Sequence, residues 1–257
     1  MNLKKWRLDV VSRNKKSEIG LYLSSNEDGK NENGHRIGDT FESLEEKVYK
    51  FIKNKIIYHE IKPGDRIIDK NIAEQLNVSR SLVRQVFATL VKEEFLILVP
   101  RSGFYVRKIT KKEVKEIYNI RKILESYATE LAVSRISASE IDQLEKTFKR
   151  AKNDLDQDEV FSFIETDARL HRLLIDNSGN EYLKNMLDKY NNRYVFYRAI
   201  DLSRIERAKE SYFEHYKIFQ AVKEKNEKLA AKLIGEHIEN AKNIILKNFD
   251  KYTFGKK

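Results

Sequence analysis

The chain has 257 residues and no cysteine, so it forms neither disulfides nor thiolate metal sites, and it fits a reducing cytoplasm, the expected location. Its 50 lysines and arginines exceed its 40 aspartates and glutamates, and the formal charge of +10 favours a polyanionic partner such as DNA. No run of about 18 apolar residues is present, which excludes a membrane-spanning helix.

The beginning of the chain changes character near residue 40. Residues 1–40 contain the polar, non-periodic stretch SSNEDGKNENGHRIGD, which predicts a flexible lead-in with no assigned role. Ser43 and Glu46 then form a capping box, S-x-x-E, that predicts the start of an amphipathic helix. This helix is expected to end near Tyr58.

Residues 41–109 have the element order of a winged helix-turn-helix domain. Pro63-Gly64 separates the first helix from two further helices, predicted over 69–76 and 79–93. Two β-rich runs on either side of residues 100–103 predict a hairpin, which is the wing.

The helix over residues 79–93 has the features of a DNA recognition helix. Ser79 stands at the N-cap, where the free N–H groups of the first turn suit a phosphate. Arg80 and Arg84 lie one turn apart, and a guanidinium can bind guanine as a fork. Two arginines alone are typical of any solvated helix face, but Arg101 at the hairpin tip adds a second basic feature. The opposite, apolar stripe and its expected packing partners are Val83, Phe87, Leu90, Ile72 and Leu76.

Residues 110–257 are predicted to form an all-α bundle, which makes the whole fold mainly α. Thr110 and Glu113 form a second capping box, and apolar residues then recur at helical spacing as far as Phe249. Six helices are predicted, separated by breaks near Ser137, Asp156, Gly179, Asp201 and Asn226. The apolar side chains expected in the interior include Phe163, Leu170, Leu174, Phe213, Phe219 and Ile234.

Four polar residues of this bundle have the spacing of metal ligands. Asp167 and His171 are four residues apart and share one helix face. His215 and His237 each lie eleven residues from Asn226, where a turn is expected, so an antiparallel hairpin places them at the same height. One carboxylate and three imidazoles suit Zn, Ni, Mn or Fe, with one or two coordination positions left open. Each histidine taken alone is equally explained as a packed or surface residue without a metal.

The stretch KPGDRIIDKNIAEQLNVSRSLVRQVFATLVKEEFLILVPRSGFYV resembles the DNA-binding domain of the GntR family of bacterial transcriptional regulators. The Val-Ser-Arg-x-x-Val-Arg core at residues 78–84 is its most specific part. The sequence departs from the family pattern at Gln85, where Glu is usual, and at Glu94, where a glycine usually ends the helix. The resemblance implies DNA contacts by Lys70, Ser79, Arg80, Ser81, Arg84, Arg101 and Gly103.

Residues 110–249 resemble the FadR-type effector domain, or FCD domain, in the subset with one aspartate and three histidines. The segments NIRKILESYATELA and DNSGNEYL contribute to this resemblance. It implies a divalent transition metal that helps to hold a small carboxylate effector, with Arg121 and Arg193 as candidate partners of the carboxylate. Both arginines are equally compatible with a position on the surface. The implied metal ligands are Asp167, His171, His215 and His237.

The predicted function is a ligand-responsive transcriptional regulator that binds a palindromic operator as a homodimer. A metal-dependent hydrolase docked to DNA by its winged helix is the alternative, because an Asp/His site with an open position can activate water. No general base in a metallopeptidase-like arrangement is evident, so no catalytic residue is assigned. A purely architectural DNA binder is disfavoured by the polar cluster inside the bundle.

Overall fold

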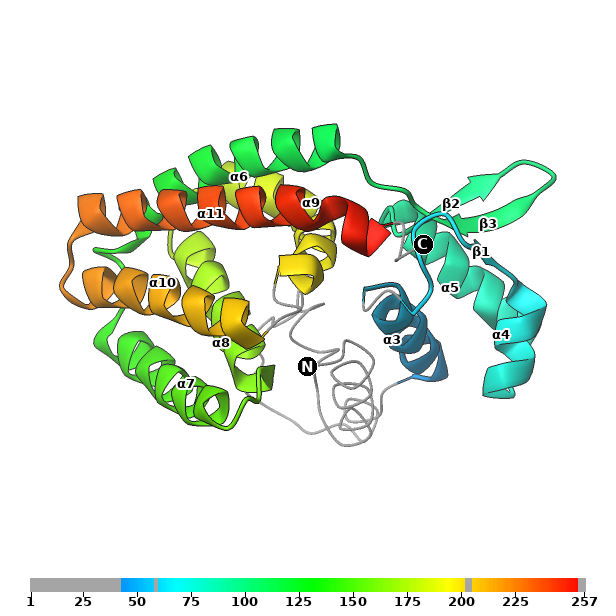
Figure 1. The fold of residues 1–257 in the computed structure, drawn as a ribbon, viewed down its shortest axis with the longest axis horizontal. Helices are drawn as coiled ribbons and strands as arrows, with labels where there is room; N and C mark the ends of the chain where they lie inside the picture. Colours follow the sequence, from blue (N-terminus) through cyan, green and yellow to red (C-terminus); the bar gives the residue numbers. More distant parts are fainter. Residues whose placement is uncertain (1–42, 58–59, 202–204, 254–257) are drawn as a thin grey trace. The chain divides into compact units, whose positions relative to one another are not determined.

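The computed structural model describes residues 43–57, 60–201 and 205–253, and both the lead-in and Tyr58 lie outside them. These residues form nine α-helices and one three-stranded sheet, so the prediction of a mainly α fold is confirmed (Figure 1). The chain divides into two compact units, with the boundary between Ile109 and Thr110. Each unit is described by itself.

The first unit has the element order predicted for a winged helix-turn-helix. Ser43 Oγ accepts a hydrogen bond from the N–H of Glu46 at 3.1 Å, so the predicted cap begins the first helix. The sheet is antiparallel with strand order β1-β3-β2, and the hairpin of β2 and β3 forms the wing (Figure 1). The elements are α3 (Leu44–Ile57), β1 (Arg66–Ile67), α4 (Asp69–Leu76), α5 (Arg80–Lys92), β2 (Leu96–Val99) and β3 (Gly103–Val106).

One apolar stripe of α5 forms the centre of this unit. Val83, Phe87 and Leu90 are fully buried, as predicted, and Ile72 of α4 is buried with them. The ring of Phe87 packs edge-on against Phe104 of β3, with 5.0 Å between the ring centroids. Because these side chains occupy one side of α5, the other side is exposed, and its arginines face solvent.

Helix α5 ends without the glycine that is usual at the end of this helix in the GntR pattern. Glu94 has a φ of 63°, the left-handed conformation that glycine adopts most readily. The N–H of Glu94 donates to the carbonyl of Val91 at 3.1 Å, and the N–H of Phe95 donates to that of Leu90 at 2.9 Å. These two bonds form a Schellman motif. Arg107 also forms an ion pair with the Glu94 carboxylate at 2.7 Å. Helix α5 therefore ends at the position where the family pattern has a glycine, with a glutamate in its place.

Six helices make up the described part of the second unit, as predicted. Thr110 Oγ1 caps the first of them by accepting from the N–H of Glu113 at 3.1 Å, and Ser137 with Glu140 forms a complete capping box at the start of the second. In Figure 1 the last helix lies along the first, and α10 packs against it. The helices are α6 (Lys111–Ala132), α7 (Ala138–Asp156), α8 (Phe161–Asp176), α9 (Glu181–Asp201), α10 (Ile205–Lys223) and α11 (Glu227–Thr253).

The predicted interior of the second unit is confirmed except at one position. Phe213 has 56% of its surface exposed, so the prediction that it lines the interior is wrong. The neighbouring helix position His215 is fully buried, and two residues along a helix correspond to about 200° of rotation. A helix that buries His215 therefore exposes Phe213. The expected interior residues that are buried are Phe163, Leu170, Leu174, Phe219 and Ile234.

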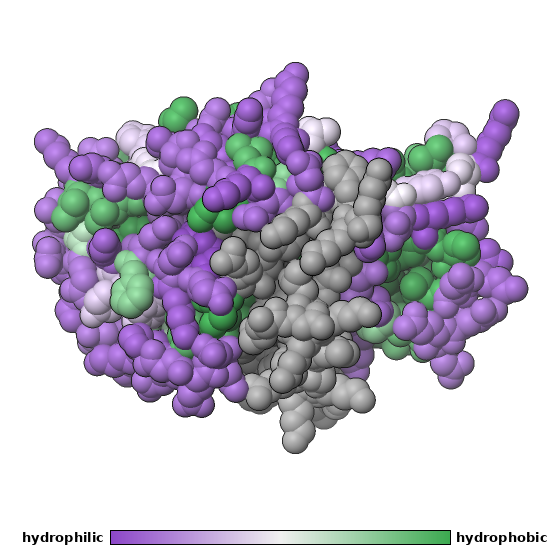
Figure 2. All heavy atoms as spheres, in the orientation of Figure 1, coloured by the Kyte–Doolittle hydropathy of each residue, from purple (hydrophilic) through white to green (hydrophobic). Residues whose placement is uncertain are grey.

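The surface is largely polar, as expected for a chain with 35% charged residues. Figure 2 shows hydrophilic side chains over most of the visible face, with separate hydrophobic areas on both units. Among the helices that the structure describes, none combines the length and the apolar character needed to cross a bilayer.

Candidate functional site

The start of α5 presents the two serines predicted to contact DNA. Ser79 is the N-cap, and its Oγ accepts from the N–H of Leu82 at 3.2 Å. Ser81 Oγ lies 3.0 Å from Ser79 Oγ, and both residues are exposed. The free N–H groups and the helix dipole at this end favour an anionic group such as a phosphate.

Arg80 and Arg84 project from the exposed side of α5, with 61% and 66% of their side chains accessible. Sequence reasoning missed the residue that positions them. Asp69, the first residue of α4, lies 3.0 Å from Arg80 Nη2 and 3.7 Å from Arg84 Nε. An exposed ion pair of this kind contributes little to stability, so a base or phosphate can replace the carboxylate at low cost. Asp69 thus holds both guanidinium groups side by side on the exposed face of α5.

The other predicted DNA contacts lie on α4 and the wing. Lys70 is exposed, with Nζ 3.8 Å from a Glu74 carboxylate oxygen. At the hairpin tip, Arg101 is exposed with a φ of 62°, and Gly103 has a φ of 111°. A side chain at φ 111° is strained, so glycine is needed there for the tight turn.

Asp167, His171, His215 and His237 come together in the interior of the second unit. Each offers one ligand atom, and these atoms all lie within 4.8 Å of one another. The residues come from α8, α10 and α11, and all four are buried. The rings of His215 and His237 have centroids 4.2 Å apart, so the equal spacing of these residues about Asn226 does bring them to the same height.

The distances within the cluster suit a single metal ion. His215 Nε2 lies 2.8 Å from Asp167 Oδ1 and 3.3 Å from His171 Nε2. Adjacent ligand atoms bound to one ion at about 2.0–2.2 Å are separated by roughly 2.8–3.6 Å in octahedral or tetrahedral geometry. His171 Nε2 and Asp167 Oδ1 are 3.9 Å apart, so these two side chains would have to move closer together to be adjacent ligands of one ion. The donor set of one carboxylate and three imidazoles therefore fits a transition metal.

A second layer of acceptors orients each imidazole. His171 Nδ1 lies 2.5 Å from a Glu125 carboxylate oxygen, and His237 Nδ1 lies 2.6 Å from one of Glu214. His215 Nδ1 lies 2.7 Å from the backbone carbonyl of Ser211. An acceptor at Nδ1 fixes the proton on that nitrogen and leaves Nε2 as the coordinating atom. All three rings are therefore prepared to bind through Nε2.

Protonation states in the cluster also favour coordination. Burial lowers the pKa of His171, and burial together with the nearby His215 lowers the pKa of His237 to about 3. Burial raises the pKa of the Glu214 carboxyl, but the hydrogen bonds and charges of His237 and Arg207 together outweigh this, and the pKa falls to about 2. Neutral imidazoles supported by ionised carboxylates are the forms in which these side chains bind a metal.

Arg121 lies beside the cluster, where sequence reasoning placed a carboxylate partner. Its side chain is buried and forms an ion pair with Glu125, and Nη2 lies 3.3 Å from His171 Nδ1. The guanidinium also lies over the ring of Tyr194, 4.8 Å from its centroid. The second candidate, Arg193, belongs to α9, but its side chain is outside the part of the chain that the structure describes.

Glu125 and Glu214 were not predicted from the sequence. Glu125 follows Arg121 by four residues, so their shared helix face was a usable signal. Glu214 precedes His215 directly and therefore points to a different side of α10, where it meets His237 of α11 and the buried Arg207. Only the packing of two helices brings Glu214 to its partner.

Glu214→Gln is expected to weaken metal affinity about 10- to 100-fold, because it removes the charge that supports His237 as a ligand. Glu210→Gln is the matched control, since Glu210 lies on the same helix beside Arg207 but is exposed. Zinc affinity of both variants is measured by competition with a chelating dye. Equal affinities would show that Glu214 has no part in orienting His237.

Comparisons with known proteins assign both units. Residues 44–106 match the family of bacterial regulatory proteins named gntR, and residues 116–240 match the FCD domain. The HTH-type transcriptional regulator YdhC of Bacillus subtilis is 34% identical over 196 residues, which cover 75% of this chain and 86% of YdhC. The regulator McbR of Escherichia coli is 31% identical over 138 residues, covering 54% of this chain and 62% of McbR.

The solved structure of E. coli McbR/YncC has the same fold. It superposes with a TM-score of 0.66 at 24% sequence identity and covers 81% of this chain and 100% of that chain. A structure described as a transcriptional regulator GntR from Rhodococcus sp. RHA1 superposes with a TM-score of 0.64 at 19% sequence identity and covers 80% of this chain and 99% of that chain. The match to YdhC agrees with the winged helix of the first unit and with the helical second unit and its buried Asp/His cluster. The chain therefore belongs to the GntR family of transcriptional regulators, with an FCD domain as its effector-binding part.

Proposed function

We propose that this regulator binds a palindromic operator as a homodimer and changes its DNA affinity when a small carboxylate effector binds at the metal site. The observation that supports this most directly is the buried cluster of Asp167, His171, His215 and His237, with Arg121 beside it. Buried polar groups are costly unless they are hydrogen-bonded, paired or bound to a metal, and a shared metal ion would satisfy all four side chains at once. The protein would act in the cytoplasm, where bacterial DNA is read.

The proposed operator follows from the geometry of the first unit. A single recognition helix reads only a few base pairs, and α5 has 13 residues with its candidate contacts at the N-terminal end. A dimer places two such helices in successive major grooves, so the two half-sites are related by a twofold axis. Arg80 and Arg84 are the proposed base readers, and Lys70, Ser79, Ser81 and the wing with Arg101 and Gly103 are the proposed backbone contacts.

The proposed effector class follows from charge and geometry in the second unit. Arg121 and Glu125 form a neutral pair, and one divalent metal with Asp167 leaves one positive charge in a buried site. A single carboxylate on the effector neutralises that charge. The metal would supply a Lewis-acid position for one carboxylate oxygen, and Arg121 would hold the other through its guanidinium fork. The matched families and relatives are regulators, and we propose no catalytic role for the cluster.

The effector changes DNA affinity only if it binds one arrangement of the dimer better than another. The test is a selection of DNA sites from a random library, followed by affinity measurements with a panel of small carboxylates in the presence of zinc, nickel or manganese. We expect a palindromic site and at least one carboxylate that changes its affinity about 5- to 150-fold. Recovery of a site with no twofold symmetry would contradict the dimer model, and a panel without any effect would contradict the carboxylate sensor.

A further inference from the structure

We infer that Arg66 of β1 is an additional DNA contact, which binds a backbone phosphate next to the wing tip. This inference rests on the proposed function of the first unit as a DNA reader. It adds to the contacts on α4, α5 and the hairpin a residue from the strand that precedes the helix-turn-helix.

The strand pairing places Arg66 on the outer face of the sheet. In the antiparallel pair of β1 and β3, Arg66 stands opposite Tyr105 and Ile67 stands opposite Phe104. Successive side chains of a strand point to opposite faces. Ile67 is buried, and Phe104 packs against Phe87 in the core. Arg66 therefore points outward, and it is exposed.

From this face the guanidinium of Arg66 lies over Gly103. A Cβ placed on Gly103 would be 3.6 Å from both Nε and Nη2 of Arg66, which is van der Waals contact. The diagonal position of Gly103 relative to Arg66, two residues from Tyr105 along β3, accounts for this approach. Gly103 begins the strand that follows the hairpin tip, so Arg66 brings a second guanidinium to the part of the wing where Arg101 stands.

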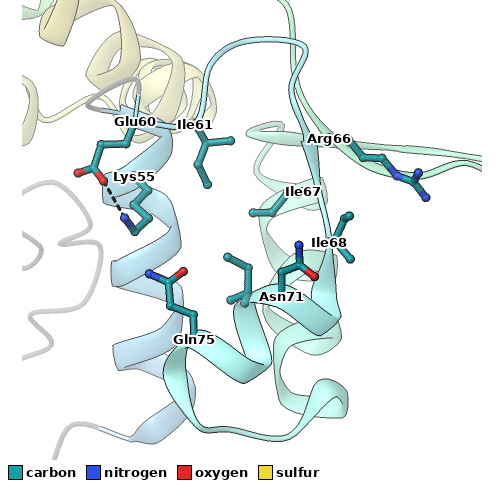
Figure 3. A pocket seen from close by; sticks show the side chains of 9 residues that line it. Lys55, Glu60, Ile61, Arg66, Ile67, Ile68, Asn71 and Gln75 are labelled. Atoms are coloured by element: carbon teal, nitrogen blue, oxygen red, sulfur yellow. Dashed lines mark hydrogen bonds and ion pairs between the residues drawn. The ribbon is translucent and has the colours of Figure 1, made fainter.

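Arg66 is one of the residues that line a neighbouring cavity, and Figure 3 shows that its side chain points out of this cavity. The cavity, of about 270 Å³, lies between α3, β1 and α4, and isoleucines such as Ile67 and Ile72 contribute to its lining. Lys55 and Glu60 form an ion pair at 2.7 Å on one side of it. Arg66 extends away from this cavity toward the hairpin strands (Figure 3). Its charged end is thus directed to the wing and not to a partner in the pocket.

The charge of Arg66 is not neutralised within the described part of the chain. There, no carboxylate lies within ion-pair distance of Arg66 or of Arg101. Arg80 and Arg84, in contrast, share Asp69. Arginines without a carboxylate partner at one end of a sheet form a local positive field, and a guanidinium binds phosphate oxygens as a fork. A phosphate of the DNA backbone is the ligand that fits this geometry and charge.

The test compares Arg66→Ala with Lys92→Ala in salt titrations of DNA affinity. Lys92 is the matched control, because it is an exposed basic residue of the same unit at the C-terminal end of α5, away from the N-terminal contacts. The proposed dimer carries two copies of Arg66, and loss of both phosphate contacts reduces the magnitude of the slope of log affinity against log salt by about 1.8. The ratio of wild-type to Arg66→Ala affinity should therefore fall about 12-fold between 50 mM and 200 mM salt. The change in slope caused by Arg66→Ala should be the same on the operator and on random DNA. Lys92→Ala should leave the slope unchanged.

Arg66→Lys keeps a point charge and guards against a folding defect in the alanine variant, so it should retain the wild-type slope. An unchanged slope for Arg66→Ala, in a preparation where Arg84→Ala loses operator affinity, overturns the role of Arg66 and leaves the proposed function intact. A loss that depends on one base pair overturns the assignment to phosphate. Wild-type protein that binds no selected DNA overturns the proposed function itself, and this inference with it.

Discussion

Arg84→Ala is expected to lower the affinity of the dimer for its operator by at least about 30-fold while changing its affinity for random DNA far less. A bidentate contact between an arginine and guanine contributes about 1–3 kcal/mol of discrimination. A dimer uses two copies of Arg84, so the combined loss is about 2–6 kcal/mol. The measurement is fluorescence anisotropy with the selected operator and with a scrambled duplex at one fixed salt concentration.

The structure explains why this change should leave the fold intact. The side chain of Arg84 is 66% exposed, and its pairing with Asp69 at 3.7 Å is an exposed contact of little value to stability. Arg84→Lys is the control, because lysine keeps the charge for phosphates but cannot form the planar fork. The affinity of Arg84→Lys for the operator should be as low as that of Arg84→Ala, and its affinity for random DNA should equal that of the wild type. Equal losses on both DNAs would show that Arg84 contacts phosphate and not a base.

Much of the fold could be predicted because local signals are strong in this chain. Capping residues such as Ser43, Ser79 and Thr110 accept the hydrogen bonds expected of them, and the helices begin next to these residues. The periodic apolar stripes give the right core, since a helix buries whichever face is apolar. The prediction for Phe213 was wrong because it rested on the apolar side chain alone. Phe213 lies on the opposite side of the helix from the buried His215.

The end of α5 at Glu94 shows a limit of reasoning from residue type. Glycine is favoured in the left-handed conformation, but a glutamate occupies it here, with an ion pair to Arg107. The cost of about 1–2 kcal/mol for a side chain in this conformation is small compared with the packing of the helix. Tertiary packing therefore decides where the helix ends, and the residue type only modifies the cost.

The spacing of residues in the sequence predicted the four members of the buried cluster, but it did not predict the side chains that orient them. The equal distances of His215 and His237 from Asn226 required only an antiparallel pair of helices, which is a property of two neighbouring segments. Glu125 meets His171 from α6, and Glu214 meets His237 across the interface of α10 and α11. Such contacts depend on the rotation of each helix about its axis, which a single sequence does not specify. The ion pair of Asp69 with Arg80 could not be predicted for the same reason, because Asp69 belongs to the preceding helix, α4.

His215→Ala is expected to abolish high-affinity metal binding. Protein purified without a histidine tag should contain about one transition metal ion per chain by elemental analysis, and the variant should contain none. His215 is fully buried, and its Nε2 lies 2.8 Å from Asp167 and 3.3 Å from His171, so its removal takes away the ligand that touches two others. The variant keeps Asp167, His171 and His237, but Asp167 loses its 2.8 Å neighbour and the alanine leaves a cavity in the ligand sphere. We therefore expect the three remaining ligands to bind metal too weakly to retain it through purification.

Thermal stability gives a second readout that does not depend on copurified metal. A ligand at 100 times its dissociation constant stabilises the folded state by about 2.7 kcal/mol. Adding zinc, nickel or manganese to chelator-treated wild-type protein should therefore raise its melting temperature by several degrees, and His215→Ala should show no such rise. The comparison uses the metal-induced shift of each protein, because the alanine leaves a cavity that lowers the melting temperature by itself. Asp167→Asn, which keeps the shape of the carboxylate, should retain a reduced shift.

The two possible outcomes separate the halves of the proposed function. If neither protein binds metal after incubation with these ions, the four side chains form a packed polar cluster, and the proposal of a carboxylate effector at a metal fails. Arg80, Arg84 and the wing are in the other unit, so the proposed DNA contacts are unaffected by that result. If the wild type alone binds one ion, a buried positive charge beside Arg121 would favour an anionic effector, and small carboxylates would be the first compounds to test.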